Sequence, residues 1–161
     1  MTTKSVASLA DTETNTRTAD ALGLVKRYMF GSLGVGIVPV PLADMALLTS
    51  IQVKMLHSLA ALYGTPFSSG AARTVIAGLV GGGVSVSLTS LLVPLGQLTR
   101  MAGMSVFAGA STYAIGRVFI QDFESGGKFL SLDPEQVKSF YERQFDNGKD
   151  ELRKSWAGVQ P

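Results

Sequence analysis

The sequence predicts an all-α protein of four to five helices, with a central glycine-rich helical hairpin that associates with a membrane. Three observations support this prediction. Charged residues make up only 16% of the 161 residues, whereas soluble domains carry about 25%. The segment between Asp44 and Asp122 contains no acidic residue. Proline and glycine also separate segments in which apolar residues recur every three or four positions, which is the period of a helix.

The acid-free segment carries only four cations, at Lys54, Arg73, Arg100 and Arg117. Soluble domains normally mix both signs of charge on their surface, so a purely basic middle favours anionic lipid head groups as its environment. Nucleic-acid-binding proteins usually gather cations on one face, often beside aromatic rings. These cations are scattered singly, and we therefore expect no nucleic-acid partner.

The two ends of the chain differ from its middle because they hold nearly all of the acidic residues. Residues 1–20 are rich in Thr, Ser, Asn and Asp and have no continuous apolar core, so they lack the pattern of a signal peptide. They are predicted to form a disordered tail in the cytoplasm. Residues 21–147 are predicted to form the helical domain, and residues 148–161 a charged C-terminal tail.

The first helix is predicted over residues 21–38, with Asp20 as its N-cap. Pro39 and Pro41 end it, because each proline disfavours helical geometry in the residue before it. The second helix begins at Pro41 and ends near Tyr63, before Gly64. Its apolar positions follow spacings of three and four, so this helix is predicted to be amphipathic.

Asp44 lies in the first turn of the second helix and has two interpretations. An acid in this position stabilises the positive end of the helix dipole. Alternatively, Asp44 forms a polar contact at the head-group layer, with Arg73 or Arg100 as its partner. The first interpretation is the more common one for an acid so placed.

The third helix is predicted to start at Ser68 or Ser69 and to end before Pro94. Residues 74–93 are uncharged, and a helix of about 20 residues crosses roughly 30 Å of hydrocarbon. Small residues recur at steps of four along it, at Thr74, Gly78 and Gly82. This spacing lets two helices approach closely within a membrane.

A fourth helix is predicted to begin after Pro94-Leu95-Gly96 or near Arg100 and to run through residues 101–123. Its small residues form two further ridges at steps of four, one of Ala108, Thr112 and Gly116 and the other of Ser105 and Gly109. We expect the third and fourth helices to pack along these ridges as a hairpin and to support self-association into a homo-oligomer. The cations that flank the apolar segments are predicted to contact lipid head groups: Lys26, Arg27, Arg73, Arg100 and Arg117.

The fifth helix begins at Asp133, which is followed by proline at the first helical position and by an acid in the first turn. One face is apolar, so we expect it to dock on the rest of the domain. Asn147 and Gly148 are predicted to end it.

No arrangement of residues in the sequence indicates catalysis or a bound cofactor. The glycine-rich runs at residues 31–36 and 78–83 lack the lysine of a phosphate-binding loop and the strand context of a dinucleotide site. His57 is the only histidine and has no second ligand at metal-binding spacing. Cysteine is absent, which excludes disulfides and a thiolate nucleophile. We therefore expect a protein that is not an enzyme, without metal or cofactor.

Two blocks of the chain carry a family resemblance. Residues 34–68 contain a PxPxxD element made by Pro39, Pro41 and Asp44, and residues 107–145 contain GASTYAIGRVFIQDFESGG, which ends at Gly126 and Gly127. With Lys26 and Arg27, these blocks resemble the bacterial domain of unknown function family 697. That family includes YcjF-like inner-membrane proteins and proteins fused to small GTPase domains. The resemblance implies a helical, membrane-associated module, in some members coupled to a GTPase, with no assigned catalytic residue.

The leading hypothesis is a membrane anchor or scaffold of the bacterial cytoplasmic membrane, with cytoplasmic termini and a small GTPase as a partner in trans. The alternative is a soluble helical bundle that hides its glycine-rich helices in an oligomer, as a shell or adaptor protein, or that inserts into membranes as a pore-forming module. A channel or transporter subunit is a third hypothesis, which the scarcity of intramembrane polar groups disfavours.

Overall fold

The computed structural model describes residues 3–35, 41–91, 97–131 and 133–158, and these residues form helices joined by turns, with no strand among them. The α-helices are α1 (Thr3–Ser32), α2 (Pro41–Tyr63), α3 (Ser69–Leu91), α4 (Gln97–Glu124) and α5 (Pro134–Ala157), and a short 3-10 helix, η1 (Phe129–Ser131), precedes α5. The predicted all-α fold is therefore confirmed.

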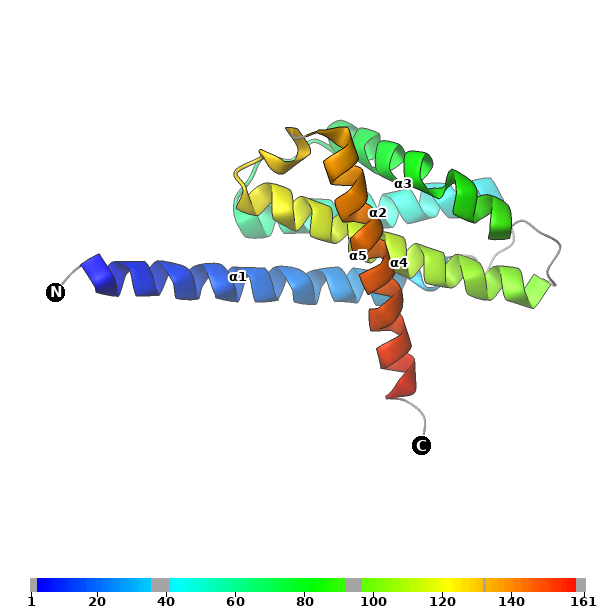
Figure 1. Cartoon of the computed structure of the whole chain (residues 1–161), viewed down its shortest axis with the longest axis horizontal. Coiled ribbons are helices and arrows are strands. Elements are labelled where there is room, and N and C mark those ends of the chain that lie inside the picture. Colours follow the sequence, from blue (N-terminus) through cyan, green and yellow to red (C-terminus); the bar gives the residue numbers. More distant parts are fainter. Residues whose placement is uncertain (1–2, 36–40, 92–96, 132, 159–161) are drawn as a thin grey trace.

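Helix α4 forms the centre of the fold. It packs against α1, α2 and α5, and Figure 1 shows α5 crossing in front of it while α2 lies behind. From residue 107 to residue 120, every side chain of α4 except Arg117 is buried. Small residues at Ala108, Gly109 and Gly116 let the neighbouring helices approach this closely.

Three glycines mark the tightest contacts in the fold. A Cβ atom added at Gly116 of α4 would lie 2.5 Å from Cγ2 of Val25 in α1. One added at Gly109 would lie 2.9 Å from Cδ2 of Leu33. One added at Gly148 of α5 would lie 3.0 Å from the backbone of Ala110. The small ridges predicted on α4 thus receive α1 and α5.

The predicted glycine-rich hairpin of α3 and α4 is not seen in the described part of the chain. Helix α3 packs more extensively against α2 than against α4. Thr74 and Gly78 are exposed, and a Cβ added at Gly78 would meet no atom within 4 Å. Gly82 lies in α3, but its surroundings fall outside the described side chains. The physical reason is that α1 and α5 already occupy the small-residue faces of α4.

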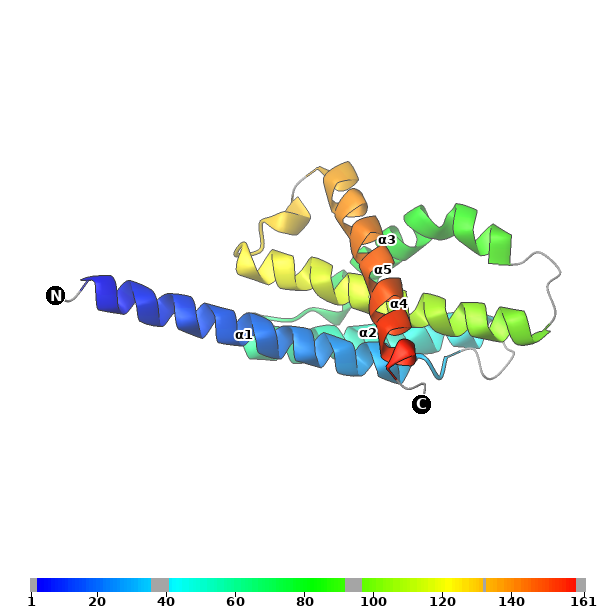
Figure 2. The same cartoon turned by 60° about the horizontal axis from the view of Figure 1, so that its bottom comes forward.

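Helix α1 differs from the prediction at both of its ends. It begins at Thr3, so residues 3–20, expected as a disordered tail, are helical, and it ends at Ser32 instead of residue 38. The hydroxyls of Thr12, Thr14 and Thr16 each donate to the backbone carbonyl four residues earlier, and the bond from Thr12 to Ser8 is 2.8 Å long. Thr18 also donates to Glu124 of α4 at 2.6 Å. Figures 1 and 2 show the first half of α1 projecting beyond the other helices.

Helix α5 begins as predicted and ends later than predicted. Asp133 accepts a hydrogen bond from the backbone N–H of Glu135 at 3.2 Å, with Pro134 at the first position. The helix then continues through Asn147 and Gly148 to Ala157, so most of the C-terminal tail expected at 148–161 is helical. Gly148 does not end the helix. It lies where α5 packs closely on α4, and a side chain at this position would collide with the backbone of Ala110.

The bounds of α2 and the start of α3 are as predicted, and α4 begins at Gln97, the earlier of its two predicted starts. Helix α2 spans Pro41–Tyr63, and Gly64 follows with a φ of 65°. Helix α3 begins at Ser69, where the Oγ of Ser68 accepts from the N–H of Ala71 at 3.3 Å. The end predicted for this helix at Val93 lies outside the described residues.

A buried polar chain connects three helices inside this apolar core. Gln52 of α2 donates through its Nε2 to Ser111 Oγ of α4 at 3.1 Å. Ser111 is also 3.2 Å from the hydroxyl of Tyr141 in α5. All three side chains are buried, and hydrogen bonds of this kind help to select one helix register over alternatives.

We predict an alkaline stability loss that depends on Tyr141. Burial raises the pKa of Tyr141 from 10.0 to about 12, although the bond with Ser111 acts in the opposite direction. The unfolded chain therefore releases this proton at a lower pH than the folded chain does. Stability from this group is complete below pH 10 and is lost as the pH rises towards 12.

The measurement is the free energy of unfolding against pH for the wild type and for Tyr141→Phe. Above pH 10, the wild type is expected to lose up to about 1.4 kcal/mol per pH unit more than the variant. Parallel curves for the two proteins would show that Tyr141 is not protected from ionisation in the fold.

Candidate membrane-facing surface

Helices α2 and α3 together present an acid-free surface, which we call the α2–α3 face. Its only cations are Lys54 and Arg73 among the described side chains, and it is otherwise built from small, apolar and uncharged polar residues. The α2–α3 face consists of the exposed residues Ala43, Ala46, Leu47, Ser50, Lys54, His57, Ala61, Ala71, Arg73, Thr74, Ala77, Gly78 and Gly81.

Helix α2 is the only helix in the described part of the chain that is long and apolar enough to cross a membrane, over Ala43–Tyr63. A core helix of a soluble protein passes the same test of length and composition, but such a helix is mostly buried. Only 33% of the relevant window of α2 is buried inside the protein. Leu47 is 52% exposed. The exposed side of α2 carries Leu47 together with small and polar residues, while its other described large apolar side chains are buried or half-buried.

The span expected from the sequence was the third helix, over residues 74–93. Its first part belongs to the α2–α3 face through Thr74, Ala77 and Gly78. From residue 82 onward, the side chains of α3 lie outside the described residues. The structure therefore adds α2 to the candidate surface, whereas the sequence predicted only that this helix is amphipathic.

The cations predicted to contact head groups do not lie on one surface. Lys26 forms an ion pair with Glu151 of α5, with Nζ 2.7 Å from Oε2. This ammonium group lowers the pKa of Glu151 through its hydrogen bond. Arg27 is exposed on α1, and only Arg73 lies on the α2–α3 face.

The other two predicted cations belong to α4. Arg117 is half-buried, and its Nε has no hydrogen-bond partner among the described atoms. The side chain of Arg100 lies outside the described residues.

The residues of the family motif form turns and helix ends. Pro41 begins α2, and Asp44 is only 8% exposed in its first turn. No ion pair joins Asp44 to Arg73 in the described structure. Gly126 and Gly127 follow α4 with φ angles of 70° and 78°, a conformation that favours glycine. Pro39 lies outside the described residues.

The turn after α4 is held by one acidic side chain. Oδ1 of Asp122 accepts from the backbone N–H of Leu130 at 3.0 Å. The N–H of Gly127 donates to the carbonyl of Asp122 at 2.8 Å. Asp122, Gly126 and Gly127 at the end of this block therefore shape the connection between α4 and η1.

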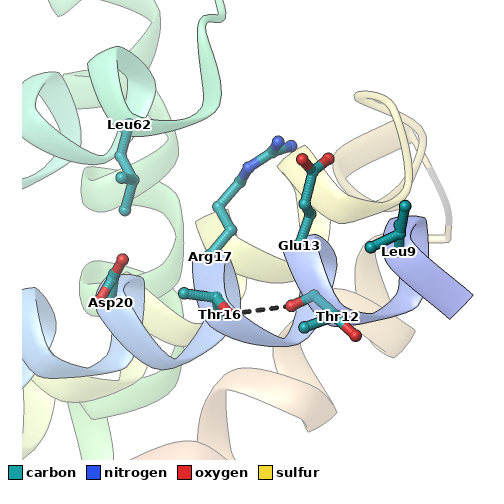
Figure 3. Close-up of a pocket in the computed structure, with 7 residues that line it drawn as sticks. All are labelled: Leu9, Thr12, Glu13, Thr16, Arg17, Asp20 and Leu62. Carbon is teal, nitrogen blue, oxygen red and sulfur yellow. Dashed lines mark hydrogen bonds between the residues drawn. The ribbon is translucent and has the colours of Figure 1, made fainter.

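A shallow pocket lies where the projecting half of α1 meets the end of α2. It has a volume of about 420 Å³ and is lined mainly by polar side chains of α1, with Leu62 of α2 on the opposite side (Figure 3). The guanidinium of Arg17 lies 6.0 Å from the ring centre of Tyr63. Tyr63 also donates to Glu124 at 3.0 Å. These contacts attach the middle of α1 to α2 and α4.

Neither surface contains an arrangement suited to acid–base, nucleophilic or metal chemistry. Within the described ranges, no three potential metal-binding side chains gather at one place. His57 is exposed, and its ring packs edge-on against Phe67 at a centroid distance of 5.3 Å. What α2 and α3 offer is an exposed surface of small, apolar and uncharged polar residues whose charged groups are all cationic among the described side chains.

Sequence analysis missed the polar side chains that join the helices. Gln52, Ser111 and Glu124 each bond to a residue more than 25 positions away in the sequence. Gln52 and Ser111 are polar residues at positions where the helical period predicts apolar ones, and this exception could have marked them as buried polar residues. The sequence pattern does not show which residues they bond to.

The fold and the α2–α3 face define a class: an all-helical protein with a central buried helix and one acid-free, largely apolar flank. The family model described as "Domain of unknown function (DUF697)" matches residues 2–150. The chain belongs to this family.

The chain is also similar to Magnetosome membrane protein 22 of Magnetospirillum gryphiswaldense. The two sequences are 41% identical over 137 residues, which cover 80% of this chain and 70% of the relative. No solved structure matches the chain.

Proposed function

We propose that this protein is a non-enzymatic scaffold of a bacterial membrane, embedded through its α2–α3 face. The observation that carries the proposal is the exposure of α2, a helix apolar and long enough to span a membrane, of which only a third is buried. The similarity to a magnetosome membrane protein supports a membrane location. The membrane would be the cytoplasmic membrane or a compartment enclosed by membrane within the cell.

The charged elements of the fold would remain in the cytoplasm in this arrangement. Ion pairs between residues three positions apart cover the exposed side of α5, such as Lys149 with Asp146 at 2.7 Å and Arg153 with Asp150 at 2.8 Å. Helices α1 and α5, the first and last of the described chain, would both be on the cytoplasmic side. These helices are the surfaces available to a partner, and the family resemblance favours a small GTPase in that role.

Alkaline carbonate extraction of cell membranes tests the proposal. We expect the full-length chain to remain in the membrane pellet and to need detergent for purification. Its release into the supernatant as a peripheral or soluble protein would overturn the proposal and favour the soluble oligomeric bundle. That alternative has one observation in its favour, because α4 is covered by helices of its own chain as in a soluble bundle.

Self-association is the second part of the proposal. Thr74 and Gly78 are exposed on α3, where small residues at a step of four permit close approach of a second helix. Gly78→Leu is predicted to reduce the yield of crosslinked dimer in membranes by several fold. Gly31→Leu is the matched control, since Gly31 is also exposed with no atom within 4 Å of an added Cβ. Equal crosslinking of both variants would exclude this ridge as the interface.

A further inference from the structure

A groove runs between the inner side of α2 and α3, and its exposed lining residues are Arg73, Ala77 and Gly81 of α3. Its volume is about 320 Å³, which is within the range of about 300–1,000 Å³ typical of small-molecule sites. Met45 and Leu48 of α2 and Ile76 and Val80 of α3 form its apolar walls, and Arg73 contributes the only charged group among its described lining residues.

The groove has a polar end and an apolar end. Because a short turn joins α2 to α3, the two helices run in opposite directions, and Arg73 is the lining residue of α3 nearest to that turn. Gln52 is the lining residue of α2 nearest to the same turn, and its Nε2 is engaged by Ser111. Met45 and Val80 lie towards the opposite end. The groove therefore changes along its length from a cation to aliphatic side chains.

We propose that this groove binds one anionic phospholipid, with its phosphate at Arg73 and one acyl chain along Leu48, Ile76 and Val80. The inference rests on the proposed function, which places the exposed edge of the groove, Arg73, Ala77 and Gly81 of α3, against lipid. A guanidinium presents several N–H donors in a plane and pairs with phosphate oxygens more specifically than an ammonium does. No acidic side chain among the described lining residues would repel the anion.

The shape of the groove favours a lipid over a soluble phosphate compound. A nucleotide or sugar phosphate needs several hydrogen-bond donors around it, whereas most of this groove is apolar. An acyl chain needs only apolar contact, which scales with the surface removed from water. An amphiphile with a negative head thus satisfies both ends of the groove at once.

Native mass spectrometry of the purified full-length chain in detergent, titrated with phosphatidylglycerol or phosphatidylcholine, tests the proposal. The wild type is expected to retain phosphatidylglycerol in preference to phosphatidylcholine. Arg73→Gln should reduce retained phosphatidylglycerol about fivefold, the effect of about 1 kcal/mol per basic residue at a lipid surface. Ala77→Phe, at an exposed residue that lines the groove, should reduce retention of both lipids by filling it.

Two controls separate the site from general surface charge. Lys54→Gln removes the other cation of the α2–α3 face, one that does not line the groove, and should leave retention unchanged. Arg73→Lys keeps the charge and should retain most of the lipid. Equal losses in Arg73→Gln and Lys54→Gln, or normal retention in Ala77→Phe, would overturn the groove proposal. Carbonate extraction tests membrane location separately. A protein that stays in the membrane pellet but shows no lipid preference would contradict the groove proposal and leave the proposed function standing.

Discussion

Replacing Leu47 by glutamate is expected to shift most of the protein from the membrane to the soluble or aggregated fraction. Leu47 is 52% exposed near the start of the candidate span Ala43–Tyr63, and a charged side chain in a membrane helix costs up to about 2.5–3.5 kcal/mol, the value at the helix centre. A cost of this size reduces the partition into the bilayer by about a hundredfold. The measurement is the fraction of protein that floats with vesicles or sediments with membranes.

Leu9→Glu is the matched control for Leu47→Glu. Leu9 is 64% exposed but belongs to the projecting half of α1, which the proposed arrangement leaves outside the bilayer. Its substitution should leave membrane partition unchanged. Equal partition of the two variants would show that the α2–α3 face does not contact lipid, whichever way the variants then distribute.

Replacing Gly116 by alanine is expected to lower the free energy of unfolding by about 1–3 kcal/mol, the usual cost of overpacking a core. The added Cβ would lie 2.5 Å from Cγ2 and 3.2 Å from Cβ of Val25. Valine has little rotational freedom in a helix, so α1 must move away from α4 to relieve the contact. Denaturation of the purified protein, followed by loss of helical circular dichroism, measures the change.

Two further variants make the Gly116→Ala result specific. Gly78→Ala adds the same methyl group where nothing lies within 4 Å, so it should be neutral or stabilise by up to about 1 kcal/mol through helix propensity. In a Val25→Ala background, Gly116→Ala should lose most of its cost, because the two side chains then fit together. A stability loss that persists in the double variant would contradict close packing of α1 on α4 at this point.

Local signals in the sequence predicted most of the helices correctly. Pro41, Ser69 and Pro134 begin α2, α3 and α5 as expected, because proline at the first position and a capping side chain act within one turn of the chain. The outer limits of α1 and α5 were predicted wrongly. Thr-rich residues near the N-terminus and the pair Asn147–Gly148 have weak helical preference, and contacts such as Thr18 with Glu124 and Gly148 with Ala110 accompany the longer helices.

The candidate surface was predicted only in part. The acid-free segment pointed to a membrane from charge alone, and its position along the chain needed no structure. Which helix presents that surface could not be read from charge alone, because α2 and α4 both belong to the acid-free segment, but a third of the α2 window is buried whereas α4 is buried almost throughout residues 107–120. The small ridges of α4 likewise indicated close packing without identifying α1 and α5 as the helices received there.

The sequence by itself determined that this chain is helical, that its middle avoids negative charge, and that it resembles a family of membrane-associated proteins. Each of these follows from composition or from residues close together in the chain. Only the tertiary structure decided that α4 is the core, that α2 and α3 form the outward acid-free face, and that Arg73 stands at one end of a groove. These features depend on which helices pack against the small-residue surface of α4. That choice is made by contacts between residues far apart in the sequence.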